Sequence, residues 1–338
     1  MATKKIRKIA LEEAFQLPDL ATNNNNFTAP NGASDLTANL VDIHEQRLRG
    51  MDENEISYMV LSLTSAGPQD QRDPAAAQAL AERANNYLAE RIRQNPSRFG
   101  GFGALSMHDP QSAALEARRA IKELGFHGLL VNDFQTTGAD GEGAIFYDQP
   151  EWDVFWKEIE ELDVPLYIHP RLTTPAATEL FLTGRPWLRG STFFFSVVTQ
   201  LGGVSLHVLG LYANGVFDRF PRLQIIIGHM GEHIPYQIWR FDHRMSLYTE
   251  GSLPKAKRSL RDTMKTNISI TTSGHYGTPA LLFAIQELGI DRIMFSIDYP
   301  YETIDEGAKW FDSITELTEQ QKEQIAFGNA RKLLKLNQ

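Results

Sequence analysis

Short apolar segments rich in β-branched residues alternate with longer amphipathic segments along almost the whole chain. Eight of the short segments have the length and composition of buried strands. These segments are residues 6–11, 57–63, 100–105, 128–131, 165–168, 223–227, 267–272 and 292–297. The segments with a helical period include residues 74–94, 110–124, 151–162, 196–214, 234–249, 279–288 and 319–334. Strands that alternate with helices are parallel and joined by crossovers, so this pattern predicts an α/β fold with a parallel sheet.

The number of strand–helix units favours a closed barrel over an open sheet. Eight units fit a (β/α)8 TIM barrel, whose typical length of about 250 residues leaves room for insertions in a chain of 338 residues. An open doubly wound sheet normally has a glycine-rich phosphate turn after its first strand, whereas here the first strand leads into Glu12 and Glu13. We therefore expect a single barrel domain over residues 1–338, with a long polar first βα loop at residues 18–34.

Composition excludes several classes of site and partner. The chain contains no cysteine, so disulfides, thiolate zinc sites and cysteine nucleophiles are excluded, and any metal must be held by His, Asp and Glu. The net charge of −9 argues against nucleic acid or an anionic membrane as a main partner, because both require a basic surface. No segment has the apolar length of a membrane span or of a signal peptide core. We therefore expect a cytoplasmic protein.

Side chains that can bind a metal or a proton follow four of the predicted strands. In a (β/α)8 barrel the C-terminal ends of the strands meet at one mouth, where catalytic residues lie. The residues at these four ends are Glu12, His169, His229 and Asp298. A solvated carboxylate or a packed histidine is the ordinary alternative for each of them taken alone. Together, the carboxylates of Glu12 and Asp298 with the imidazole of His169 form a ligand set suited to a catalytic divalent ion.

The segment HMGEH at residues 229–233 matches the H-x-x-E-H motif of inverted zinc proteases, which requires both histidines on one helix face. Its context argues against a continuous helix, because a strand precedes it, glycines flank the first histidine and a proline follows the second. We instead predict that Glu232 hydrogen-bonds the ring of His229, which would fix its tautomer and raise its basicity. The alternative is that His229 packs structurally and Glu232 caps the next helix.

Four motifs follow one another along the chain: ALEEAF at residues 10–15, YIHPR at 167–171, GHMGE at 228–232 and FSIDYP at 295–300. Together they resemble the γ-resorcylate and 2,3-dihydroxybenzoate decarboxylases, which belong to the aminocarboxymuconate-semialdehyde decarboxylase branch of the amidohydrolase superfamily. The resemblance covers nearly the whole chain, and it is specific because the motifs keep their order and separations. It implies a TIM barrel of the metal-dependent amidohydrolase type.

The resemblance also implies roles for individual residues. One divalent ion (zinc, manganese or magnesium) would be held by Glu12, His169 and Asp298, with no organic cofactor, and His229 paired with Glu232 would flank the substrate. A homodimer or homotetramer with a small aromatic acid as substrate is expected, in which a neighbouring subunit supplies one aromatic side chain. The positions that would line the substrate pocket are Asn132, Arg240, Phe195 and Phe27, the last of these coming from the neighbour.

These residues predict the non-oxidative decarboxylation of an ortho-hydroxybenzoic acid to a phenol and carbon dioxide. In this hypothesis Asp298 delivers a proton to the ring carbon, and the pair of His229 and Glu232 handles the phenolic proton. The alternative is a metal-dependent hydrolase of a lactone, ester or amide on the same barrel, although Ala14 stands where the superfamily commonly has a second histidine ligand. A barrel that binds aromatic acids without catalysis is the third possibility.

Overall fold

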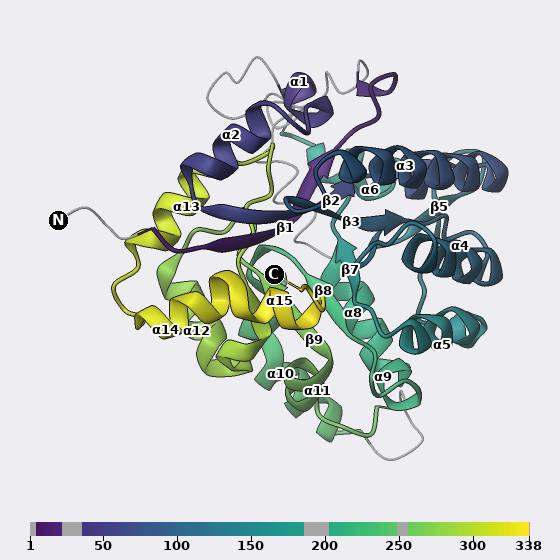
Figure 1. Cartoon of the computed structure of the whole chain (residues 1–338). Coiled ribbons are helices and arrows are strands. Elements are labelled where there is room, and N and C mark those ends of the chain that lie inside the picture. The colour runs from purple at the N-terminus through teal and green to yellow at the C-terminus, as the bar shows by residue number, and fades with distance from the viewer. Residues whose placement is uncertain (1–4, 22–35, 186–202, 249–255, 338) are drawn as a thin grey trace.

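Eight parallel strands form the centre of the protein (Figure 1). The computed structural model describes residues 5–21, 36–185, 203–248 and 256–337. The order of the strands in the sheet is β1-β2-β3-β4-β7-β8-β9-β10, and neighbouring strands pair in parallel. The strands are β1 (Lys8–Phe15), β2 (Ile56–Leu63), β3 (Phe99–Ala104), β4 (Gly128–Asn132), β7 (Leu166–His169), β8 (Ile225–Ile227), β9 (Ile268–Thr271) and β10 (Ile293–Met294). The (β/α)8 barrel predicted from the alternation is confirmed.

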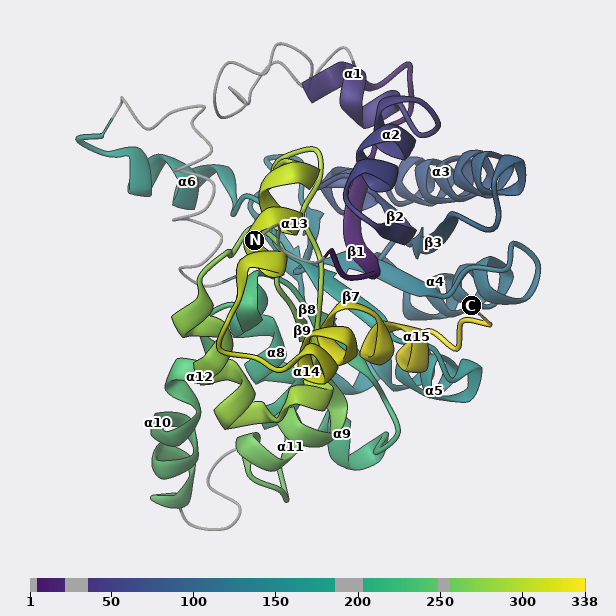
Figure 2. The same cartoon turned by 60° about the vertical axis from the view of Figure 1, so that its left-hand side comes forward.

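Helices surround these strands in both views (Figures 1 and 2). The main helices among the described residues are α2 (Gln46–Glu53), α3 (Pro74–Gln94), α4 (Pro110–Lys122), α5 (Asp153–Leu162), α8 (Gly203–Ala213), α10 (Ile234–Ser246), α11 (Leu260–Asn267), α12 (Thr278–Leu288) and α13 (Ile304–Ser313). The helices α3 and α4 each begin with an aspartate cap followed by a proline. Asp73 accepts a hydrogen bond from the backbone of Ala76, and Asp109 accepts one from Ser112.

The C-terminal helix α15 (Asn329–Leu333) closes one end of the barrel. A cluster of buried residues inside the barrel, including Leu11 and Tyr167, continues onto Ala330 and Leu334 of this C-terminal segment. Figure 1 shows α15 crossing in front of the strands. Apolar side chains therefore fill this end of the barrel, and the opposite end, where the strands finish, is left for a site.

The barrel is joined between its last and first strands by individual hydrogen bonds. No β10–β1 ladder is present among the described residues, but the backbone N–H of Ala14 donates to the carbonyl of Tyr299 at 2.7 Å. Lower on the same seam, the buried ammonium of Lys8 lies 2.8 Å from a carboxylate oxygen of Asp312. A backbone hydrogen bond and a buried ion pair therefore take the place of a β10–β1 ladder in closing the barrel.

Some expected elements differ from the structure. The helix expected over residues 319–334 is divided into α14 (Glu319–Glu323), a π-helical turn η8 (Gln324–Gly328) and α15. A short hairpin, β5 (Gln135–Thr137) with β6 (Gly143–Ile145), follows β4 and was not predicted. Most of the long first loop, and residues 196–202 of the helix expected before Asn214, lie outside the described residues. Across the described ranges, no helix combines the length and apolar character needed to cross a bilayer.

Candidate active site

Glu12 reaches the mouth of the barrel through an irregularity in β1. The pairing of β1 with β2 shifts register between Leu11 and Glu13, and Glu12 has a left-handed φ of 73°. Its Oε2 accepts hydrogen bonds from the hydroxyls of Tyr167, Thr271 (3.1 Å) and Ser273. Its Oε1 is buried and has no hydrogen-bond partner within the described residues. One carboxylate oxygen is therefore held in place while the other is available.

His169 and Asp298 bring their side chains to this available oxygen. His169 is the last residue of β7, and its Nδ1 lies 2.7 Å from the carbonyl oxygen of Pro170, an acceptor that requires the proton on Nδ1. Its Nε2 then faces Glu12 Oε1 at 3.3 Å. Ligand atoms of Glu12, His169 and Asp298 all lie within 4.8 Å of one another.

The donor set of these residues fits a divalent cation. Two carboxylates and an imidazole nitrogen meet at one point, and Glu12 Oε1 is without a hydrogen-bond donor there. Burying acceptors together without donors is unfavourable unless a cation compensates them. Oxygen and imidazole ligands with further positions open to solvent or substrate suit a catalytic ion rather than a closed structural site.

His229 stands next to this cluster and is oriented by Glu232. His229 Nδ1 lies 2.5 Å from Glu232 Oε1, and its Nε2 lies 3.5 Å from Asp298 Oδ2. The residues from His229 to His233 do not form a continuous α-helix, because several of them have positive φ and α10 begins only at Ile234. The arrangement expected for His229 and Glu232 from the sequence is thus the one that the structure has.

Burial and charge act in opposite directions on the ionisation of these groups. Burial lowers the pKa of His229, but the carboxylates of Glu232 and Glu12 outweigh it and raise that pKa well above its ordinary value. Burial raises the pKa of Asp298, while its hydrogen bond with His229 opposes the rise. Burial also raises the pKa of Glu13 to about 8, against the effect of its hydrogen-bond donors and of Arg47.

Backbone strain is concentrated at the same place. Glu12, His229 and Asp298 have φ values of 73°, 47° and 80°. A non-glycine residue in the left-handed region costs of order 1–3 kcal/mol and persists only where its surroundings hold it there. Three of the four positions selected from the sequence as strand ends are therefore also strained positions, as is common at functional sites.

A cavity of about 470 Å³ opens beside the cluster and is large enough for a small aromatic acid. His169, His229 and Asp298 line it, and helix α6 (Pro175–Leu182) contributes to one wall. In Figure 2, α6 extends outward from the barrel. Residues that sequence reasoning did not select also line the cavity, among them Ser65, Tyr301 and Glu302. Ser65 and Tyr301 lie near strand ends, which is the one sequence signal that points to them.

The remaining residues expected to line the pocket have different positions. Asn132 is buried, and its amide nitrogen donates to the hydroxyl of Ser65 at 2.9 Å, so it supports a residue that lines the cavity. Arg240 is exposed on α10 and is not part of the cavity lining. Phe27 and Phe195 lie outside the described residues. The roles of these four residues stay predictions.

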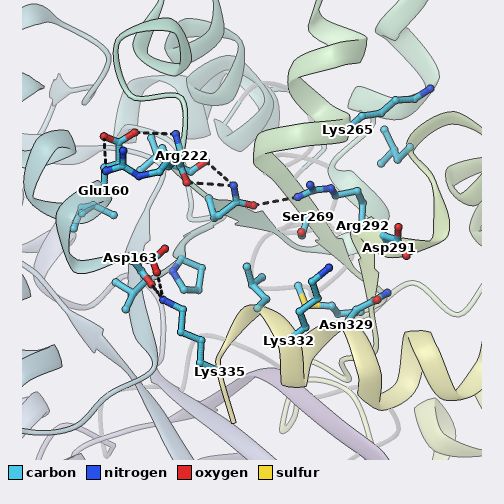
Figure 3. A pocket seen from close by; sticks show the side chains of 18 of the residues that line it. Glu160, Asp163, Arg222, Lys265, Ser269, Asp291, Arg292, Asn329, Lys332 and Lys335 are labelled. Atoms are coloured by element: carbon cyan, nitrogen blue, oxygen red, sulfur yellow. Dashed lines mark hydrogen bonds and ion pairs between the residues drawn. The ribbon is translucent and has the colours of Figure 1, made fainter.

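A second cavity, of about 350 Å³, lies at the other end of the strands, beside Pro165 and Leu223 (Figure 3). Several of its charged or polar side chains are already paired with one another (Figure 3). The pairs are Arg222 with Glu160, Lys335 with Asp163 and Arg292 with Gln224. Within the described residues, the cluster at the other mouth is the group of His and carboxylate side chains that could hold a metal. We therefore assign the candidate active site to the mouth that contains Glu12.

Comparison with known proteins gives a family for this site. The amidohydrolase family model matches residues 30–336. A γ-resorcylate decarboxylase from Polaromonas sp. (strain JS666) is 42% identical over 332 residues, which cover 98% of this chain and 99% of the relative. The crystal structure of a 2,6-dihydroxybenzoate decarboxylase in complex with 2,6-dihydroxybenzoate is 42% identical, with a TM-score of 0.89 over 98% of this chain and 100% of that one.

Another solved structure contains a metal. The crystal structure of the dihydroxybenzoic acid decarboxylase from Polaromonas sp. JS666, with bound manganese and the inhibitor 2-nitroresorcinol, is 41% identical, with a TM-score of 0.89 and 98% coverage of both chains. These likenesses extend over nearly the whole chain and confirm the resemblance that the four sequence motifs indicated. The chain belongs to the amidohydrolase family and, within it, to the γ-resorcylate decarboxylases.

Proposed function

We propose that this chain catalyses the metal-dependent, non-oxidative decarboxylation of an ortho-hydroxybenzoic acid to the corresponding phenol and carbon dioxide. The observation that carries the proposal is the convergence of Glu12, His169 and Asp298 beside a cavity of about 470 Å³. A divalent ion held by these three residues would supply positive charge for the carboxylate and ortho-oxygen of the substrate. Manganese is the first ion to test, because a relative of 41% identity contains it.

The side chains around the cavity divide the proton transfers between them. Asp298, which lines the cavity, delivers a proton to the ring carbon that bears the carboxylate, a role that requires its carboxyl to be protonated when the substrate is bound. Without an ion in the site, the neighbouring carboxylates hold a proton on His229; with a cation offsetting their charge, His229, oriented by Glu232, would accept the proton of the ortho-hydroxyl, so that the oxygen donates electrons into the ring. The bond between the ring and the carboxylate then breaks, carbon dioxide leaves, and the electron pair of that bond restores the aromatic ring. His229 returns its proton to the phenolate oxygen, which gives the phenol. One proton is consumed for each carbon dioxide released.

The names of the relatives indicate which substrate to test first. 2,6-Dihydroxybenzoate is the first acid to test, because relatives of about 42% identity are named for it. Within the described residues there is one group of three possible metal ligands, and Ala14 offers no further ligand. This favours a single ion and decarboxylation over hydrolysis by a two-metal centre.

We also propose that residues 1–338 form one barrel domain and that the protein assembles as a homodimer or homotetramer. The exposed aromatic side chains of Tyr236 and Trp239 on α10 support assembly, since they are 50% and 67% exposed in the single chain. Light scattering coupled to size-exclusion chromatography tests the assembly: a monomer at micromolar concentration contradicts it.

The experiment that tests the function compares metal-stripped protein with protein reconstituted with Mn²⁺, Zn²⁺ or Mg²⁺. Each form is incubated with 2,6-dihydroxybenzoate, 2,3-dihydroxybenzoate, salicylate and benzoate, and the phenol and carbon dioxide are measured. We expect equal amounts of phenol and carbon dioxide from at least one ortho-hydroxy acid, no reaction of benzoate, and loss of activity without metal. Hydrolysis of an activated ester without any carbon dioxide release would favour the hydrolase instead.

A further inference from the structure

Glu13 is a fully buried carboxylate directly after the proposed ligand Glu12, and its hydrogen bonds reach the far side of the barrel seam. Its Oε1 accepts from the hydroxyl of Ser296 and from the backbone N–H of Ile297, both at 3.0 Å. Its Oε2 accepts from the backbone N–H of Tyr299 at 2.9 Å. One carboxylate thus binds the peptides on both sides of Asp298.

The segment that Glu13 holds is one that would not keep its shape unaided. Asp298 has a φ of 80°, and a left-handed non-glycine residue needs surrounding contacts to maintain it. In addition to the bonds of Glu13, the N–H of Ala14 donates to the carbonyl of Tyr299 at 2.7 Å. The β10 ladder itself extends only over Ile293 and Met294, so it ends well before Asp298.

The buried Arg47 makes further contacts between the same two segments. The guanidinium of Arg47 donates to the carbonyl of Ala14 at 2.7 Å and lies 4.7 Å from the centre of the Tyr299 ring. It is fully buried, and its charge acts on Glu13. The strand that carries Glu12 and the segment that carries Asp298 are therefore bound together by Glu13, by the backbone of Ala14 and by Arg47.

We propose that Glu13 is a positioning residue for the metal centre: by fixing the peptides on both sides of Asp298, its carboxylate sets the position of Asp298 relative to Glu12. This inference rests on the proposed metal site and adds a residue that does not touch the ion. Hydrogen bonds that orient ligands in this way are commonly worth 10- to 100-fold in metal affinity. A purely structural role, in which Glu13 only closes the barrel seam, is the competing explanation.

The seam contains a matched control for that explanation. Asp312 is also a buried carboxylate that joins the last part of the barrel to β1, through Lys8 at 2.8 Å and the N–H of Ile6 at 3.3 Å. It is not among the proposed ligands or the residues that line the cavity. If closing the seam is the whole role of Glu13, Glu13→Gln and Asp312→Asn should have the same effects.

The test measures Mn²⁺ binding by electron paramagnetic resonance, in which free aqueous Mn²⁺ gives a strong signal that bound Mn²⁺ does not. Glutamine keeps the volume of Glu13, but its amide group cannot accept the hydrogen bonds on one side. We expect Glu13→Gln to weaken Mn²⁺ binding 10- to 100-fold and, at saturating Mn²⁺, to lower kcat with little change in KM. We expect Asp312→Asn to lower the melting temperature while changing Mn²⁺ binding by less than twofold.

The possible results distinguish a failure of the proposed metal site from a failure of the positioning role of Glu13. If the wild-type protein binds no Mn²⁺, Zn²⁺ or Mg²⁺, the metal site itself is wrong. If the wild type binds Mn²⁺ and both variants bind it equally well, or are weakened equally, Glu13 has only a structural role. If Glu13→Gln does not fold, Ser296→Ala decides, because it removes one donor to Oε1 and should weaken Mn²⁺ binding several-fold, whereas unchanged binding overturns the proposal.

Discussion

The two carboxylate oxygens of Glu12 have opposite surroundings. Three hydroxyl groups donate to Oε2, while Oε1 has no donor among the described residues and faces Nε2 of His169 at 3.3 Å. The hydroxyls hold the carboxylate in one rotamer and leave Oε1 available for an ion. Tyr167 supplies one of these hydroxyls from within the barrel, where burial raises its pKa well above the ordinary value and so keeps it a donor.

Replacing His169 should remove the metal. His169→Ala deletes the imidazole nitrogen that faces Glu12, so we expect the metal content of dialysed protein to fall from about one ion per chain to nearly none. Elemental analysis by mass spectrometry measures this. His108→Ala is the matched control, because His108 bonds the carbonyl of Gln71 at 2.8 Å and does not line the cavity. Equal metal content in both variants would refute the ligand role of His169.

Replacing Asp298 should stop turnover without unfolding the chain. An amide cannot deliver a proton to the ring carbon, so Asp298→Asn should lower kcat by about 10²–10⁴-fold or more. Product formation by liquid chromatography measures the rate, and circular dichroism checks the fold. Asp305→Asn serves as control, because Asp305 pairs with exposed Lys309 at 2.5 Å on the surface. Substantial residual activity in Asp298→Asn would remove Asp298 from the role of proton donor.

At the scale of elements, the site depends on how closely the ends of β1 and β8 approach. Gly228 directly follows β8, and a Cβ added there would lie 2.6 Å from Oε1 and 2.7 Å from Oε2 of Glu12. The backbone of Gly228, with φ −81° and ψ −168°, is one that alanine adopts without strain. The need for glycine at this position is therefore a matter of space beside the carboxylate.

Gly228→Ala should accordingly displace Glu12 and impair metal binding. Because three hydroxyls hold Oε2, the carboxylate cannot move away without losing hydrogen bonds, and we expect Mn²⁺ affinity to fall at least tenfold. Gly328→Ala is the control, since the nearest atom to its added Cβ is 3.8 Å away. Titration calorimetry with Mn²⁺ measures both variants, and wild-type affinity in Gly228→Ala would contradict the geometry of this site.

The elements show what the sequence could predict and where prediction failed. Alternating strands and helices predicted the barrel because each parallel strand is buried and reads as an apolar run. The first strand was expected to end at Leu11, but β1 continues to Phe15, because the two glutamates that look like a strand end find donors inside the barrel. Those donors lie 155 to 286 residues away along the chain, and no local pattern carries that information.

The candidate metal ligands could be predicted from the sequence, but the wall of the cavity could not. Glu12, His169 and Asp298 could be selected because each follows an apolar run that predicts a strand, and a barrel brings strand ends together. The cavity wall could not be predicted, because residues such as Ser65 and Glu302 have common side chains and are placed by the folded loops. The exposure of Arg240 on α10 likewise depends on how that helix packs, which its sequence does not show.

At the scale of the whole molecule, burial of an ionisable group outside the site links stability to pH. His207 on α8 is 1% exposed, and its Nε2 accepts a hydrogen bond from the N–H of Tyr147 at 3.1 Å, which requires an unprotonated nitrogen. Burial lowers the pKa of His207 to about 4, against the charge of Asp148. In the unfolded chain the pKa of histidine is about 6.5.

The stability of the protein should therefore fall on acidification through this window. Above pH 6.5 neither state protonates His207, so its contribution is complete; between pH 6.5 and about 4 only the unfolded chain binds the proton. We expect His207 to account for a loss of about 2 kcal/mol of unfolding free energy between pH 7 and pH 5. Urea unfolding at both pH values measures it. His207→Gln, which cannot titrate, should lose correspondingly less, and an identical loss would contradict the prediction.

The seam between the last and first strands has a consequence for biogenesis. Glu13 and Tyr299, which flank the two proposed carboxylate ligands, are separated by 286 residues, so the proposed binding site is not complete until the barrel closes. A nascent chain emerging from the ribosome cannot acquire its cofactor early and use it as a folding nucleus. Metal loading must follow closure, and a chain truncated before the final strand would be released empty.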